Sequence, residues 1–70
     1  MNKSILLKKL SQASRGNFFT IKLPVKSREE AETIENVAAE LEREGKIKIR
    51  ECELKETSIY IQGIMKYALT

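Results

Sequence analysis

The chain has 70 residues, 41% hydrophobic and 33% charged, which suits one small soluble domain and leaves no room for a second. It contains no His, no Trp and no Asp, so all ten acidic residues are Glu. Without His the chain lacks the usual acid–base group near neutral pH and the commonest metal ligand, which excludes Ser–His–Asp and Cys–His catalysis and zinc fingers. We therefore expect no enzymatic activity, no cofactor and no metal site.

The hydrophobic segments of the chain are short. The first apolar run, Ile5–Leu7, ends after three residues, which is too early for the core of a signal peptide. No stretch approaches the ~18 apolar residues of a membrane-spanning helix. The single cysteine, Cys52, allows no internal disulfide and no multi-thiolate metal site, and we interpret it as a small apolar strand residue. These features predict a cytoplasmic protein with no membrane contact.

Charge is distributed unevenly along the chain. Residues 1–26 carry +6 with no acidic residue, residues 27–45 carry −5, and residues 46–70 carry +2, which gives the net charge of +3. An anionic partner should therefore meet the two flanks of the chain rather than its middle.

The first 24 residues predict a helix followed by a strand. Apolar residues at helical spacing indicate a helix from about Lys3 to Arg15, with Asn2 or Ser4 as its N-cap and Gly16-Asn17 as its stop signal. The alternating segment Phe18–Leu23 indicates a half-buried strand, which Pro24 ends.

The next segment predicts a helix from Arg28 to Glu44. Ser27 and Glu30 match a capping box, and Gly45 is placed as a left-handed terminator. The helix carries one apolar stripe, made of Ala31, Ile34, Val37, Ala38 and Leu41.

Two further alternating segments, Lys46–Arg50 and Ser58–Gln62, predict a β-hairpin with its isoleucines inward. Pairing Ile47 with Ile61 and Ile49 with Ile59 makes Cys52–Glu56 the hairpin loop. The last segment, residues 63–70, is either a strand extension or a short tail.

Together these elements predict one α+β domain over residues 1–70, with the order α-β-α-β-β and two helices packed on one face of a three-stranded, mainly antiparallel sheet. The predicted core consists of Leu6, Leu10, Phe19, Ile21, Leu23, Ile34, Val37, Leu41, Ile47, Ile49, Ile59 and Ile61.

The segment from Val37 to Ile47 (VAAELEREGKI) resembles the end of the recognition helix and the start of the wing in winged helix-turn-helix regulators of bacteria. The resemblance implies a winged-helix-like fold, with the predicted hairpin as the wing, and a role in DNA binding and transcription regulation. Only residues 27–44 are available for the helices of that family, with no Gly or Pro to divide them, so this segment forms either one helix or two, and one is favoured.

The same segment is acidic, with Glu29, Glu32 and Glu40 among its outward residues, and pressing it against phosphates would be repulsive. We therefore expect nucleic-acid contacts on the outer face of the sheet, where strand parity places Phe18, Thr20, Lys22, Lys46, Lys48, Arg50, Ser58, Tyr60 and Gln62. The predicted binding residues are Lys22, Lys46, Lys48, Arg50 and Tyr60, joined by Lys8, Lys9 and Arg15 from the first helix.

Two simpler interpretations of this surface stay open. Outward lysines on strands also prevent edge-to-edge pairing of sheets. Phe18 is either a core residue or a ring on which a base stacks.

The alternative function is that of a protein-interaction module or homodimer, which would use the acidic helix and an apolar hairpin tip at Leu54. Simple solvation of the glutamates and local packing of Leu54 would explain the same features.

Overall fold

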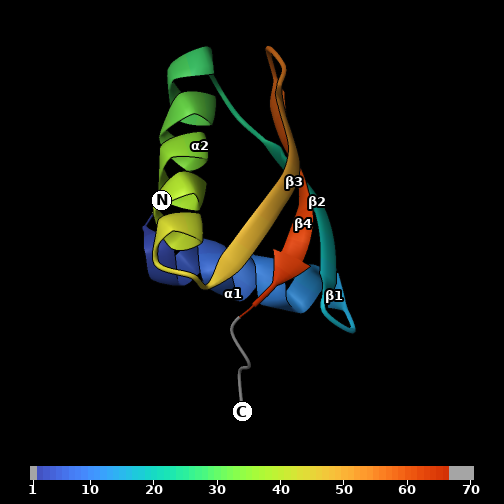
Figure 1. Cartoon of the computed structure of the whole chain (residues 1–70). Coiled ribbons are helices and arrows are strands. Elements are labelled where there is room, and N and C mark those ends of the chain that lie inside the picture. The colour runs from blue at the N-terminus through green and yellow to red at the C-terminus, as the bar shows by residue number, and fades with distance from the viewer. Residues whose placement is uncertain (1, 67–70) are drawn as a thin grey trace.

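The computed structural model describes residues 2–66 and has an α+β architecture (Figure 1). Four strands form one antiparallel sheet in the order β1-β2-β4-β3. The elements in chain order are α1 (Lys3–Ala13), β1 (Ser14–Arg15), β2 (Phe18–Pro24), α2 (Arg28–Arg43), β3 (Ile47–Leu54) and β4 (Ser58–Met65). The α+β class, the two helices and the antiparallel sheet are confirmed, and the sheet has four strands rather than the three predicted.

The additional strand, β1, corrects the predicted end of the first helix. Asn2 caps α1, because its Oδ1 accepts a hydrogen bond from the Ile5 amide at 2.9 Å, but the helix stops at Ala13. Ser14 and Arg15 pair instead with the start of β2 across a two-residue turn, in which Gly16 has a φ of 63°. This pairing with β2 gives the backbone of Ser14 and Arg15 hydrogen-bond partners after the helix has ended.

The second helix, α2, is continuous, so residues 27–44 form one helix and not two. Ser27 Oγ accepts a hydrogen bond from the Glu30 amide at 3.2 Å, as a capping box requires. The chain leaves the helix at Gly45, whose φ of 79° favours glycine. Both boundary signals in the sequence are therefore used.

The β3–β4 hairpin is longer than predicted. Ile47 pairs with Met65 and Leu54 with Ile59, so the predicted Ile47–Ile61 pairing is wrong by four residues. The loop contains residues 55–57 instead of Cys52–Glu56, and residues 63–65 are a strand extension. The longer pairing buries more side chains, since Leu54 packs against the core instead of standing at an exposed tip. The rest of the segment 63–70 that was open to a tail, residues 67–70, lies outside the described residues.

A β-bulge interrupts β3 at Arg50, between the pairs Ile49–Gly63 and Glu51–Gln62. The extra residue shifts by one position which alternate side chains of β3 face the core. Ile49 and Cys52 therefore both face the core, while Glu51 and Glu53 face outward and are exposed. The predicted direction of the isoleucines is confirmed, and the outward set of β3 gains two acidic residues that the prediction lacked.

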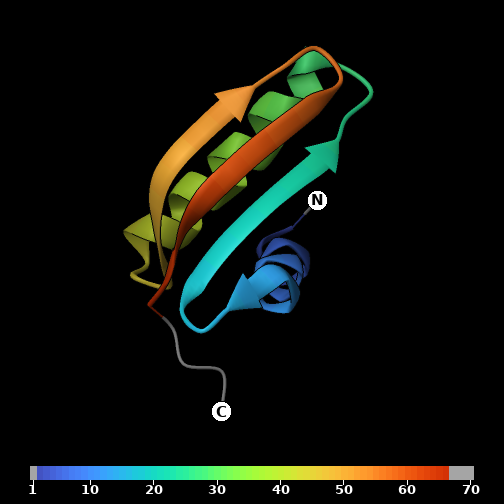
Figure 2. The same cartoon turned by 90° about the vertical axis from the view of Figure 1, so that its right-hand side faces the viewer.

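The core lies between the sheet and the two helices, and α2 covers the back of the sheet in Figure 2. All predicted core residues belong to it, although Ile21, Leu23, Val37 and Ile49 are only partly buried. The core also contains Val25, Ala31, Ala38 and Met65.

Gly63 in β4 allows this packing. A Cβ at this position would collide with the Lys48 carbonyl oxygen and would lie 2.8 Å from Phe19 Cζ. Phe19 is 1% exposed, and its ring occupies the space that a side chain at position 63 would need.

Candidate nucleic-acid interface

The outer face of the sheet is the side turned away from α2, and it faces the viewer in Figure 2. Directly paired residues on neighbouring strands share a face, so the register defines rows of side chains across this surface. The rows differ in charge from one end of the strands to the other.

The first row crosses all four strands. Arg15 pairs with Phe18, Phe18 pairs with Ile64, and Ile64 pairs with Lys48. Because neighbouring strands lie ~4.8 Å apart, these four residues follow one another over about 14 Å. We call them the Phe18 row.

The Phe18 row places an exposed ring between two cations. Phe18 is 60% exposed, and Ile64 beside it is half-buried. Within residues 2–66 the only other large hydrophobic residue with an exposed side chain is Ile5, on α1. Phe18 is therefore a surface ring, and the interpretation of it as a core residue is wrong.

The cations of the Phe18 row are available to a ligand. The ion pairs found between residues 2 and 66 use Lys3, Arg28, Lys46 and Lys55. Arg15 and Lys48 are exposed and take part in none of these pairs. The row itself contains no acidic residue, so its electrostatic character is positive.

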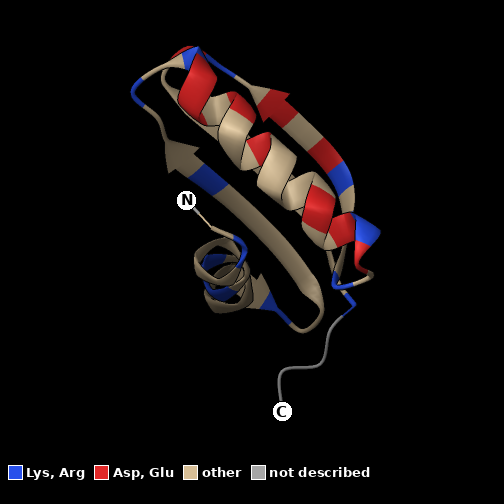
Figure 3. Ribbon diagram, turned by 90° about the vertical axis from the view of Figure 1, so that its left-hand side faces the viewer, with Lys and Arg blue, Asp and Glu red and all other residues tan. Residues whose placement is uncertain are grey.

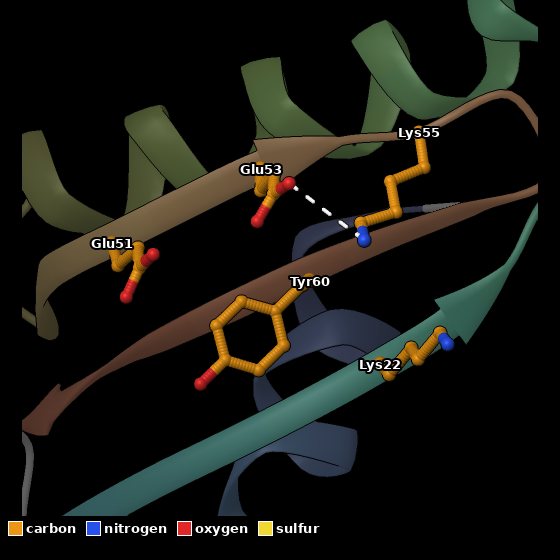
Figure 4. A pocket seen from close by; sticks show the side chains of 5 residues that line it. All are labelled: Lys22, Glu51, Glu53, Lys55 and Tyr60. Carbon is orange, nitrogen blue, oxygen red and sulfur yellow. Dashed lines mark ion pairs between the residues drawn. The ribbon is translucent and has the colours of Figure 1, made fainter.

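The opposite end of the same face has mixed charge. Tyr60 pairs with Lys22 on one side and with Glu53 on the other, and these residues line an open hollow of about 330 Å³ together with Glu51 and Lys55 (Figure 4). We call this the Tyr60 hollow.

Polar contacts within the Tyr60 hollow occupy several of its groups. Lys55 Nζ lies 3.7 Å from Glu53 Oε1, and the Tyr60 hydroxyl donates a weak hydrogen bond of 3.4 Å to Gln62 Oε1. The Tyr60 ring is half-buried. Two carboxylates and a partly covered ring make this end less suited to a nucleic-acid backbone than the Phe18 row.

The structure thus divides the eight predicted binding residues. Arg15 and Lys48 join the Phe18 row, whereas Lys22 and Tyr60 belong to the Tyr60 hollow. Arg50 is exposed at the bulge on the edge strand.

The remaining three predicted residues lie elsewhere. Lys46 pairs with Glu44 at 3.3 Å, just beyond the end of α2. Lys8 and Lys9 are exposed on α1, which packs beside β2 and lies outside the rows of the sheet. Ile64 was not predicted, because its strand was followed only to Gln62.

Glutamates are concentrated on α2 and on the second half of β3, while the charged residues of α1, β1 and β2 are all Lys or Arg (Figure 3). Where the two groups meet, Lys3 Nζ lies 2.6 Å from Glu44 Oε2. The hydrogen bond from Lys3, followed by that from Lys46, lowers the pKa of Glu44, and the same contact with Glu44 raises the pKa of Lys3. Among the residues that the structure describes, glutamates therefore neutralise cations at this junction but form no ion pair with the cations of the Phe18 row.

Cys52 is half-buried and packs against the core, in agreement with its interpretation as an apolar strand residue. Burial, followed by the nearby Glu35 carboxylate, raises the pKa of its thiol, so the reactive thiolate is disfavoured. The part of the chain described by the structure holds no cluster of three metal-ligating side chains and no helix long and apolar enough to cross a membrane.

Comparison of the chain with known protein families, with curated proteins and with solved structures finds no match in any of the three. The function of the chain must therefore be inferred from the chemistry at the two ends of the sheet face.

Proposed function

We propose that this protein binds nucleic acid through the outer face of its sheet and works without catalysis. The observation that supports this proposal is the Phe18 row, in which an exposed aromatic ring lies between two cations that form no ion pair with any carboxylate of residues 2–66. Cationic side chains neutralise phosphates, and exposed rings stack on bases.

The resemblance to winged-helix regulators adds DNA and transcription regulation to the proposal. Under that resemblance α2 would be the recognition helix and the β3–β4 hairpin would be the wing. Glu29, Glu32 and Glu40 are exposed on α2 and would repel phosphates. We therefore assign the contact to the sheet and the hairpin.

Fluorescence anisotropy with labelled duplex and single-stranded DNA, at two salt concentrations, tests the proposal. We expect binding at low salt that weakens as salt rises, because phosphate contacts release counterions. The double variant Lys48→Glu/Arg50→Glu should weaken binding by roughly tenfold or more. Failure of the wild-type protein to bind either form of DNA at low salt would contradict the proposal.

A matched control variant distinguishes an effect of this surface on binding from an effect of the net charge alone. The variant Lys26→Glu/Arg28→Glu makes the same change of charge at the start of α2, at the far end of β2 from Phe18. A carboxylate there is favoured by the helix dipole, so this variant should fold. We expect it to bind nearly as well as the wild type, and an equal loss in both variants would contradict the assignment of the surface.

A further inference from the structure

The Phe18 row combines features that suit one form of nucleic acid better than the other. It offers a ring with an exposed surface, an aliphatic neighbour in Ile64, and cations on both sides, at Arg15 and Lys48. All four residues lie on strands of one sheet, so the register sets the spacing of their backbone positions.

A DNA duplex uses few of these features. The faces of its bases are covered by stacking, and only base edges in the grooves and the outer phosphates are accessible. A short row on a sheet would meet phosphates with its cations, and the Phe18 ring would then lie against the charged backbone with nothing on which to stack.

A single strand uses all of these features. Its unstacked bases offer a π-face to an aromatic side chain, while its flexible backbone can follow cations on either side of the ring. We infer that the preferred ligand of the Phe18 row is single-stranded nucleic acid, with one base stacked on Phe18 and its flanking phosphates near Arg15 and Lys48. This inference rests on the proposed function and specifies its ligand.

A second copy of the chain fits this patch less well. Two copies meeting through the same patch would bring Arg15 and Lys48 toward the like charges of the partner, which is repulsive. An anionic ligand would instead be attracted by these cations, so charge complementarity favours a nucleic-acid strand over a dimer.

The test compares a fluorescein-labelled oligothymidylate of about 15 nucleotides with a mixed-sequence duplex of about 15 base pairs, by anisotropy at low salt. We expect the oligothymidylate to bind about tenfold more tightly than the duplex. Phe18→Ala should weaken binding of the single strand by about 5- to 150-fold, the range of one lost stacking contact, and should change duplex binding by less than about threefold.

Conservative variants separate stacking from simple apolar contact. Phe18→Tyr should keep the affinity for the oligothymidylate, whereas Phe18→Leu should lose it as Phe18→Ala does. Ile5→Ala, which removes the other exposed large hydrophobic side chain found within residues 2–66, is the matched control and should bind like the wild type.

The outcomes distinguish this inference from the proposed function. Binding of the duplex as tightly as the single strand, or full affinity in Phe18→Leu, would overturn the inference and leave nucleic-acid binding intact. Absence of binding to both probes would overturn both. A dimer in light scattering that Phe18→Ala dissociates would assign the patch to a second copy and would also overturn the inference.

Discussion

The two ends of the outer sheet face are built by the same strands and yet offer different chemistry. At one end Phe18 is exposed between two cations that lack an ion pair in the described part of the chain, and at the other Tyr60 is half-buried beside Glu51 and Glu53. The difference depends on the bulge at Arg50, because beyond it the outward positions of β3 are acidic. One inserted residue thus determines where the basic part of the face ends.

The packing beneath the Phe18 end should be the part of the molecule most sensitive to substitution. Gly63→Ala should destabilise the fold by about 3 kcal/mol, since the new methyl group collides with backbone and with the Phe19 ring on both sides of β4. The midpoint of chemical denaturation measures this loss. Thr20→Ala, at an exposed position of β2, is the control and should shift the midpoint little. Equal stability of Gly63→Ala and the wild type would show that β4 is not packed as described.

A double substitution would make the two ends of the outer sheet face alike in charge. Glu51→Lys/Glu53→Lys replaces both carboxylates of the Tyr60 hollow with cations. We expect severalfold tighter binding of single-stranded DNA at low salt and a steeper dependence on salt, by ~0.7 in the logarithmic slope for each new phosphate contact.

The control for this variant is Glu32→Lys/Glu40→Lys, which adds the same charge on the exposed side of α2. It should change affinity much less. Similar gains in both variants would mean that overall charge, and not the position of charge on the sheet, governs binding.

The weakest effect is expected for the ion pair in which Glu44 neutralises Lys3, where α1 meets the end of α2. Because Lys3 lowers the pKa of Glu44, the stabilisation from this contact is present at neutral pH and is lost as the pH falls through the lowered pKa of the folded state. Titration of the Glu44 side chain by NMR should give a midpoint below the ordinary pKa of glutamate, and Lys3→Gln should raise that midpoint. An unchanged midpoint in Lys3→Gln would contradict the contact.

Local signals in the sequence predicted most of the fold. Ser27 and Gly45 mark the ends of α2, and Asn2 caps α1, because capping depends on residues within a single turn. Alternation likewise predicted which side of β2 faces the core. The two-residue strand β1 was missed because so short a segment has no period to detect.

The register of the hairpin was harder to predict, because several pairings keep the isoleucines inward. A signal for the bulge is nevertheless present, since the inward residues of β3 fall at positions 47, 49, 52 and 54, with one irregular step between 49 and 52. Following that step would have moved Leu54 into the core and Glu51 and Glu53 to the outer face.

The candidate site was predicted in part. Strand parity placed Lys48 and Phe18 on the outer face, but only the register shows that they share a row with Arg15, from an element predicted as helix. Which cations are neutralised depends on distances between separate elements, such as Lys3 with Glu44, and the sequence contains no direct record of them.

Binding of single-stranded nucleic acid at the Phe18 row is tested most simply by an NMR titration of the ¹⁵N-labelled protein with unlabelled oligothymidylate. We predict that the largest shifts of backbone amide signals fall at Arg15, Phe18, Lys48 and Ile64, with small shifts along α2 and around Tyr60. Shifts concentrated on α2 or in the Tyr60 hollow, or no shifts at low salt, would contradict binding at the Phe18 row.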